Sequence, residues 1–563
     1  FQPHLVVLRK LGVAAIVTCR IPRGRSTGFY KRLNDVAERR VALFLPLKGV
    51  ILQLSSMRSH QFLVLTSVIL GVLESLVSGA PTIPLSKTSR IVIVGGGPAG
   101  VHYSSLLAKK GFTNIRPHEL GTVFALDTYT PIFDLAKEYD PTNTKFPFAF
   151  EKPNYLYTMG KSAGAEDSDP TTVRDFPHYL LRSIQENAPA GFPSDASPEQ
   201  LIALFQEQAV RYITLHRQIL GNYEYGLPPE PKDWSLIDMP AMEFLKANNL
   251  TALTGMFRFS QQQQGYGVLE HIPTLYLMWW SHPQAVSKIL TAQVTKSTCA
   301  YQFTRGFQSI WKAISKAHRN NIQTTNAAHP TVVQTTYDAT VTSITRGLDG
   351  VSERKLSYKT KAGNSYDVEF DHLVMAVDLS LYASLITDLT AEEREILIGT
   401  YTASTFVTTL FDSRPSPVET AGMIWHYRMT EGGRLSALRN TKLAFQYQSS
   451  NNWGNLINGH QTRIAYQYYD QPLAQVAQNT VMPLLRTDLK LAGMLGITMG
   501  TTRRFNYFPR FTQEGLKKGL PWKILDMQFD HMTTWIGSSV CFESALDVVT
   551  YNNNLIKRVH ITE

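Results

Sequence analysis

The feature that most constrains the fold is a short apolar run followed at once by closely spaced glycines. Residues 91–94 read Ile-Val-Ile-Val, and four β-branched residues in succession predict a strand that is buried on both faces. Residues 101–110 contain no Pro or Gly, which predicts a helix, and Gly111 is suited to end it. The sequence therefore predicts a strand, a tight turn and a helix in immediate succession, the usual opening of a parallel α/β sheet.

The glycines between this strand and helix have the spacing Gly-x-Gly-x-x-Gly. In that pattern the first glycine permits the tight turn, the second lets the backbone approach a pyrophosphate, and the third lets the helix pack on the strand. The helix would also direct its N-terminal N–H groups at the phosphates. We therefore predict that this turn binds a dinucleotide through Gly95, Gly97, Pro98, Ala99 and Gly100.

An acidic residue that binds the ribose is expected about 20 residues after such a turn. Glu119 stands at that distance from Gly100. Its context is less suitable, because the preceding Pro117 cannot donate a hydrogen bond to a central strand ladder. Glu119 is therefore either the ribose ligand or an ordinary loop carboxylate.

The net charge of the chain is concentrated near its beginning. The 563 residues carry a net charge of +10, yet 11 of the 55 Lys and Arg and only 3 of the 45 acidic residues lie in residues 1–80. The remainder is close to neutral and gives no electrostatic basis for binding nucleic acid. A chain of this length exceeds one ordinary core, and its hydrophobic content of 43% is typical of a globular protein with two domains or one large composite unit.

Residues 57–80 have the organisation of a secretory signal peptide. A short basic stretch precedes an apolar run over residues 62–73, and small residues allow cleavage after Ala80. The apolar run is too short to span a bilayer comfortably. We expect residues 1–56 to be an upstream segment with no role in the fold, and the mature protein to be secreted or luminal without a stable membrane span. The Arg-rich, acid-poor residues 1–40 leave a mitochondrial presequence as the alternative.

Cysteine and histidine give no sign of a metal site. Only Cys299 and Cys541 lie beyond the expected leader, so that part of the chain forms one disulfide at most. Neither these cysteines nor the 15 His match a zinc-binding spacing. One N-glycosylation sequon, Asn249-Leu-Thr251, is compatible with secretion.

Elements typical of a nucleotide-binding fold recur at separate places along the chain. After residues 91–110 they are a helix that opens at Gly306, a buried strand over 371–378, and a strand and glycine turn over 534–541 with a helix over 542–551. One contiguous domain would keep them together. We therefore predict an α/β class, α+β overall, in which several chain segments assemble a Rossmann-like domain and a helical and mixed domain is interleaved.

The intervening stretches have their own patterns. Residues 198–217 show helical periodicity, and helical segments continue over 240–295. Period-two runs joined by glycine turns predict a β-meander whose strands cover 338–345, 356–360 and 366–377.

With its segments in this order, the chain over residues 88–563 resembles the flavin-containing amine-oxidase-like superfamily. Within it, residues 265–273 and 537–544 are similar to the branch related to polyenoic fatty-acid isomerases. The resemblance implies noncovalently bound FAD, with Gly537, Ser538 and Glu543 contributing at the C-terminal segment; Glu543 either approaches the cofactor or begins its helix as a carboxylate that complements the dipole. It also divides the chain into FAD-binding segments 88–150, 301–380 and 506–563 and substrate-domain segments 151–300 and 381–505.

Two positions depart from the pattern of that superfamily. Its members usually follow the second strand with a Glu and an Arg-x-Gly-Gly turn, whereas Glu119 here runs directly into Leu-Gly-Thr-Val. Its amine oxidases commonly carry a Lys that reaches the flavin through water, whereas no Lys occurs here over residues 395–441. The second departure weakens the amine-oxidase interpretation.

The resemblance implies an FAD-dependent oxidoreductase, amine-oxidase-like, that abstracts hydride from a small apolar or amine-bearing substrate, and the signal-peptide pattern of residues 57–80 implies that it is secreted. One alternative is redox-neutral isomerisation of a double bond in a polyunsaturated fatty acid, and another is a flavin-fold binding protein whose catalysis has decayed. The missing Lys favours the isomerase, as do aromatic residues that either line a substrate channel or fill the core: Tyr266, Tyr276, Trp279 and Trp280. The sequence assigns no catalytic residue.

Overall fold

The computed structural model describes residues 6–8, 13–15, 83–86, 89–94, 98–110, 125–147, 157–158, 174–295, 297–318, 333, 335–336, 338–414, 422–440 and 461–562. The chain separates into two compact units, residues 1–80 and 81–563. In the first unit, β1 (Val6–Leu8) pairs with β2 (Val13–Ala15) in antiparallel register. The unit boundary coincides with the cleavage position expected after Ala80, and processing there stays a prediction. None of the helices within the described ranges is long and apolar enough to cross a membrane.

Three strands from distant parts of the chain form one parallel sheet in the second unit. Its order is β19 (Thr533–Trp535), β13 (His372–Met375) and β4 (Ile91–Val94), with Met375 beside both Val94 and Trp535. All residues of β13 and β19 are buried, as a parallel sheet covered on both faces requires. The sheet confirms that separate segments assemble the predicted α/β domain.

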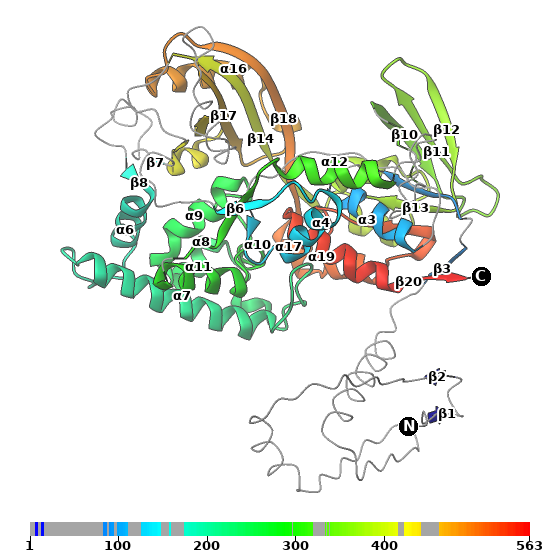
Figure 1. Cartoon of the computed structure of the whole chain (residues 1–563), viewed down its shortest axis with the longest axis horizontal. Helices are drawn as coiled ribbons and strands as arrows, with labels where there is room; N and C mark the ends of the chain where they lie inside the picture. The colour runs from blue at the N-terminus through cyan, green and yellow to red at the C-terminus, as the bar shows by residue number, and fades with distance from the viewer. Residues whose placement is uncertain are drawn as a thin grey trace, which may run out of the picture. The chain divides into compact units, whose positions relative to one another are not determined.

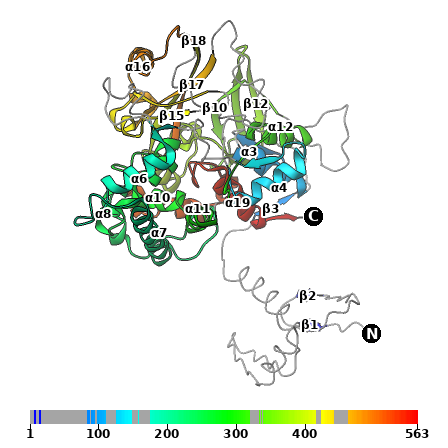
Figure 2. The ribbon, with the colours of Figure 1, turned by 60° about the vertical axis from the view of Figure 1, so that its left-hand side comes forward.

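Helices from the same distant segments pack together beside this sheet (Figures 1 and 2). Helix α3 (Pro98–Lys109) follows β4 and contacts both α12 (Phe307–His318) and α19 (Ala545–Leu555). Helix α4 (Thr130–Tyr139) contacts the latter two as well. Short strands join the segments further: β5 (Ala125–Leu126) and β6 (Lys145–Pro147) pair with β9 (Ala300–Phe303), and β3 (Ile83–Ser86) pairs with β20 (Val559–Thr562).

The predicted meander is present, but its third strand is wrong in extent. The antiparallel strands are β10 (Ala339–Thr345), β11 (Lys355–Thr360) and β12 (Ser365–Glu369). The chain then turns at Asp371, whose carboxylate accepts a hydrogen bond from the backbone N–H of Arg90 at 2.6 Å. This contact ends the exposed β12 and starts the buried β13 in the parallel sheet, so the predicted strand over 366–377 is two strands.

A seven-stranded sheet forms the upper left of Figure 1. Its order is β18 (Thr498–Phe511), β14 (Tyr401–Ser413), β17 (Gln461–Tyr469), β16 (Leu435–Asn440), β15 (Gly422–Ile424), β7 (Tyr157–Thr158) and β8 (Arg174–Asp175). Helix α16 (Gln478–Leu491) contacts β16. The expected boundary between residues 505 and 506 falls inside β18.

The helical periodicity noted in the sequence corresponds to a group of helices below that sheet in Figure 1. Helix α7 begins at Pro198 because Ser197 accepts the N–H of Gln200 while the Gln200 side chain bonds back to Ser197, and it ends at Gly221. The group consists of α6 (Phe176–Glu186), α7 (Pro198–Leu220), α8 (Ala241–Ala247), α9 (Thr254–Ser260), α10 (Thr274–Trp280) and α11 (Pro283–Thr295). Shorter helices elsewhere are α13 (Leu379–Tyr382), α14 (Ala391–Leu397), α17 (Gln513–Lys517) and α18 (Leu520–Asp526).

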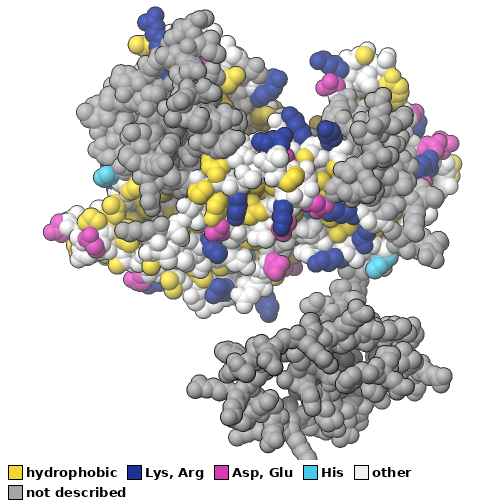
Figure 3. All heavy atoms as spheres, viewed as in Figure 1, with side chains coloured by type: hydrophobic (Ala, Val, Ile, Leu, Met, Phe, Trp, Pro, Cys, Tyr) yellow, Lys and Arg dark blue, Asp and Glu magenta, His cyan; other side chains and the backbone are white. Residues whose placement is uncertain are grey.

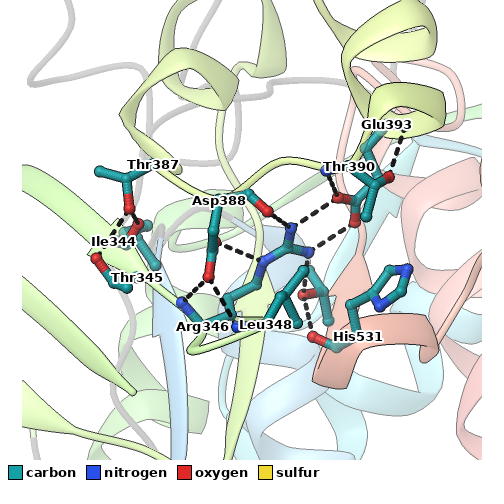
Figure 4. Close-up of polar contacts among 10 residues, drawn as sticks. Ile344, Thr345, Arg346, Leu348, Thr387, Asp388, Thr390, Glu393 and His531 are labelled. Carbon is teal, nitrogen blue, oxygen red and sulfur yellow. Dashed lines mark hydrogen bonds and ion pairs between the residues drawn. The ribbon is translucent and has the colours of Figure 1, made fainter. Parts of the chain in front are cut away.

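A buried arginine at the end of β10 ties the meander to the parallel sheet (Figure 4). The side chain of Arg346 is fully buried, and its two terminal nitrogens donate to the two carboxylate oxygens of Glu393, each at 2.6 Å. Arg346 also donates to Asp388 and to the hydroxyl of Thr533 in β19. Glu393 in turn completes the capping box of α14 with Thr390.

Basic and acidic side chains are interspersed over the described surface in the view of Figure 3. This distribution agrees with the near-neutral charge of the sequence beyond residue 80.

Candidate functional site

The carboxyl ends of the three parallel strands meet at one edge of the sheet. Backbone pairing continues one residue past the strands, since the N–H of Ala376 donates to Val94 at 2.7 Å and that of Ile536 donates to Met375 at 2.9 Å. Ligands of open α/β sheets bind in the crevice outside this edge. The residues that follow β4, β13 and β19 therefore define the candidate site.

Gly537 brings the turn after β19 close to the first turn of α3. It is buried, and its φ of +99° is disfavoured for any residue with a side chain. A Cβ built on it lies 3.6 Å from the Cβ of Ala99 and 3.7 Å from the carbonyl carbon of Ala376. Small residues at these three positions thus allow the three segments to approach one another.

The first turn of α3 carries the last part of the predicted phosphate-binding set. Pro98 is half-buried and begins the helix, and Ala99 and Gly100 are buried. The first turn contains no acidic residue, so nothing in it opposes an anion at the positive end of the helix dipole. Gly95, Gly97 and Glu119 lie outside the described residues, and their roles stay predictions.

The turn over residues 537–544 is fixed by contacts to other elements. The hydroxyl of Ser539 accepts the N–H of Leu379 at 3.0 Å, and Tyr401 donates its hydroxyl proton to the Ser539 carbonyl at 3.0 Å. Cys541 is buried with its Sγ 3.3 Å from the Gly537 carbonyl oxygen, so it fills space as a small apolar side chain. Cys299 and Cys541 are both free thiols, which answers whether they pair.

Helix α19 begins later than predicted, at Ala545 rather than at residue 542. The reason is its cap: the Ser544 hydroxyl accepts the N–H of Asp547 at 3.0 Å. Ser544 and Asp547 therefore provide the capping group and the first-turn carboxylate. Glu543 precedes the cap, so the helix-starting role considered for it is wrong, whereas a role at the cofactor stays a prediction.

Glu543 is the most perturbed carboxyl of the site. Its Oε2 is buried and has no hydrogen-bond partner among the described residues. Burial raises the pKa of Glu543 from 4.5 to about 8; the hydroxyl of Ser538 opposes this shift and the nearby carboxylate of Asp378 adds to it. Glu543 is therefore largely protonated at neutral pH.

Asp378, in the segment between the end of β13 at Met375 and the start of α13, is the second carboxyl at this edge. It caps α13 by accepting the N–H of Ser380 at 2.9 Å and also accepts the side-chain amide of Asn506 at 2.6 Å. Burial raises the pKa of Asp378 as well. Two carboxyls with raised pKa values at the ligand-binding edge of a sheet are typical of a functional site.

A cluster of aromatic side chains lies next to these carboxyls. The rings of Tyr266 and Tyr507 stack with centroids 6.0 Å apart, and those of Trp280 and Phe542 stack at 5.7 Å. Close packing is possible because Gly265 has no side chain: a Cβ there would lie 2.9 Å from the Tyr507 ring. Of the four aromatic residues predicted to line a channel or fill the core, three are buried in the core and Trp280 is half-buried.

Several members of the site were missed by sequence reasoning. Phe508 has a left-handed φ of 51°, at a register irregularity between β18 and β14, and this bulge lets Tyr507 and Phe508 both contact Tyr266. An aromatic pair in a strand gives no sign of such a bulge. Asp378 had a usable signal, because it is the first polar residue after the apolar run of the predicted buried strand.

No family model matches the chain. Polyenoic fatty acid isomerase from Ptilota filicina is 22% identical over 504 residues, which cover 83% of this chain and 94% of that protein. The crystal structure of a CLA-producing fatty acid isomerase from P. acnes superposes with a TM-score of 0.59 at 18% identity, covering 85% of this chain and all of that one. Putrescine oxidase bound to putrescine gives a TM-score of 0.51 at 12% identity, covering 85% of this chain and 99% of that one.

The fold is that of the flavin-containing amine-oxidase-like proteins. This confirms the resemblance noted in the sequence at the level of the fold. Within that fold, the carboxyl edge of the parallel sheet and the aromatic cluster beside it are the candidate active site.

Proposed function

We propose that the protein is an FAD-dependent enzyme that binds the cofactor noncovalently at the carboxyl edge of the parallel sheet. The observation that carries this proposal is the close approach of Gly537 to Ala99 and Ala376, which brings the turn after β19 to the N-terminal end of α3, where an anion is favoured. FAD, when bound, supplies hydride acceptance and return. The chain would supply binding, orientation and exclusion of water.

We propose that the reaction is a redox-neutral shift of a carbon–carbon double bond in an unsaturated fatty acid. A hydride leaves one carbon of the acyl chain and is returned to another, so no external oxidant is consumed. Three observations support this choice over the broader oxidoreductase assignment: the buried aromatic cluster beside the site, the lack of Lys in β14, and the two isomerases among the similar proteins.

Amine oxidation is the second candidate, and two observations favour it. The fold is shared with putrescine oxidase, and the aromatic rings beside the site offer faces that suit a cation. In this version molecular oxygen takes the two electrons removed from the substrate, and the amine is oxidised permanently.

In either version the chain's own residues have separable tasks. The small residues at the sheet edge admit the cofactor, and the aromatic rings of Tyr266, Phe508 and Phe542 keep water away from the reacting carbons. Asp378 and Asn506 hold the start of α13 against β18 and so fix its position beside the site. We also propose that residues 57–80 direct the chain into the secretory pathway, a step that only the sequence supports.

The cofactor assignment is tested first, by purifying the protein over residues 81–563 and recording its absorbance and thermal unfolding with and without added FAD. Flavin absorbance in the purified protein, or a rise in the unfolding temperature on adding FAD, supports the proposal. No absorbance and no thermal shift would contradict it.

A further inference from the structure

One buried oxygen at the site is without a partner. The Oε2 atom of Glu543 makes no hydrogen bond to any described residue. A buried polar atom left unpaired costs about 1–3 kcal/mol, and such an atom at the carboxyl edge of a parallel sheet is most simply explained by a ligand that completes it. The hydroxyl of Ser538 and the backbone of Phe508 are polar neighbours of this carboxyl, and both lower its pKa against the effect of burial.

The groups that face Glu543 come from every element packed around it. Asp378 follows β13, Tyr507 lies in β18, Tyr266 lies in the turn before α10, and Cys541 precedes it in its own turn. Burial raises the pKa values of both phenols and of the thiol, so these three groups stay neutral through weakly alkaline pH. Burial also raises the pKa of Asp378 and raises that of Asp547, in the first turn of α19, to about 7. The site therefore holds three carboxyls with raised pKa values, and the pKa of Glu543, about 8, lies above that of Asp547.

A carboxylate on Glu543 would face the carboxyl of Asp378 with no described cation to balance it, whereas a protonated carboxyl offers one O–H donor. We propose that the site binds flavin together with a proton, with protonated Glu543 donating a hydrogen bond from Oε2 to the bound cofactor. This inference rests on the proposed FAD binding and adds to it the protonation state that binding requires.

The consequence is a specific dependence of FAD affinity on pH. If only the protonated form binds, affinity is nearly constant below pH 7 and falls as pH rises through the pKa of about 8. The dissociation constant of FAD then rises about tenfold between pH 7 and pH 9. Removing the charge of Asp378 lowers the pKa of Glu543, because the repulsion that favours its neutral form is lost, and the fall in affinity moves to lower pH.

The experiment measures the dissociation constant of FAD for the apoprotein at pH 6, 7, 8 and 9 by quenching of flavin fluorescence, a readout independent of turnover. Wild type is compared with Glu543→Gln, which keeps shape and an N–H donor but does not titrate, and with Asp378→Asn. Glu514→Gln is the matched control, because that carboxylate is exposed and paired with Lys518. Circular dichroism at each pH confirms that every variant is folded.

The inference predicts a tenfold weakening from pH 7 to pH 9 in wild type and in Glu514→Gln, a flat profile in Glu543→Gln, and a profile displaced to lower pH in Asp378→Asn. FAD binding that is independent of pH in wild type, or that weakens equally in Glu543→Gln, overturns the inference and leaves the proposed function standing. Wild type that binds no FAD at any pH removes the proposed function and this inference with it.

Discussion

Replacing Arg346 with Met should destabilise the protein more than any exposed substitution. The side chain of Arg346 is fully buried, and it is the guanidinium that neutralises Glu393, whose side chain is 4% exposed, and Asp388 (Figure 4). Methionine fills similar volume but leaves Glu393 buried without a counter-ion. Breaking a buried pair from one side costs about 3–5 kcal/mol, and the lost hydrogen bond to Thr533 loosens β19, which leads into the site.

A double-mutant cycle separates the ion pair from the loss of packing. Urea unfolding followed by circular dichroism is compared for wild type, Arg346→Met, Glu393→Gln and the double variant. The account predicts that Arg346→Met costs about 3–5 kcal/mol, and that the double variant recovers part of this because no unpaired charge stays buried. An Arg346→Met variant within about 1 kcal/mol of wild type, or a double variant whose loss equals the sum of the single ones, would refute the reasoning.

The remaining predictions concern the site and the leader. Gly537→Ala should lower the free energy of unfolding by about 1–2 kcal/mol because of the positive φ at that position, and it should also weaken FAD binding. The control Gly363→Ala has a φ of +86° and open space around it, so it should show the backbone cost alone. Equal FAD affinity in the two variants would argue against a cofactor at Gly537. Because the pKa of Glu543 is raised in the folded state, its contribution to the free energy of unfolding is complete below pH 4.5 and is lost as pH rises to about 8. Between these pH values the wild-type apoprotein should therefore lose up to about 5 kcal/mol of stability relative to Glu543→Gln, which does not titrate. Parallel pH profiles of the two proteins in urea unfolding would exclude a raised pKa. N-terminal sequencing of the secreted protein should find Pro81 as the first residue, and a mature terminus within residues 1–56 would contradict the signal peptide. Asn249 is exposed in the turn after α8 and should carry a glycan that Asn249→Gln removes.

Local sequence rules were sufficient where the structure is locally determined. The β-branched run predicted β4, and the stretch over residues 101–110 without Pro or Gly predicted a helix, because both patterns are properties of the segment itself. The helix α3 begins earlier than predicted, at Pro98. The return of distant segments to one sheet was predicted from the recurrence of strand–turn–helix patterns. It is realised in the pairing of β4, β13 and β19.

The errors and omissions arise from contacts between residues far apart in sequence. The predicted strand over 366–377 is divided because Asp371 bonds to Arg90, 281 residues away. The start of α19 was misplaced because a Ser that caps a helix was read as part of it. The pairing of Glu543 with Asp378 and the bulge at Phe508 depend on tertiary structure, so no local pattern could predict the carboxyl pair or the aromatic wall.

The most direct test of the proposed reaction is to mix the FAD-loaded protein anaerobically with a polyunsaturated fatty acid and, separately, with a polyamine. Flavin absorbance and diene absorbance are recorded together. The account predicts new diene absorbance with the fatty acid while the flavin is oxidised again at the end of each turnover. Lasting bleaching of the flavin by the polyamine, with no diene formed from the fatty acid, would contradict the isomerase and establish an amine oxidase in its place.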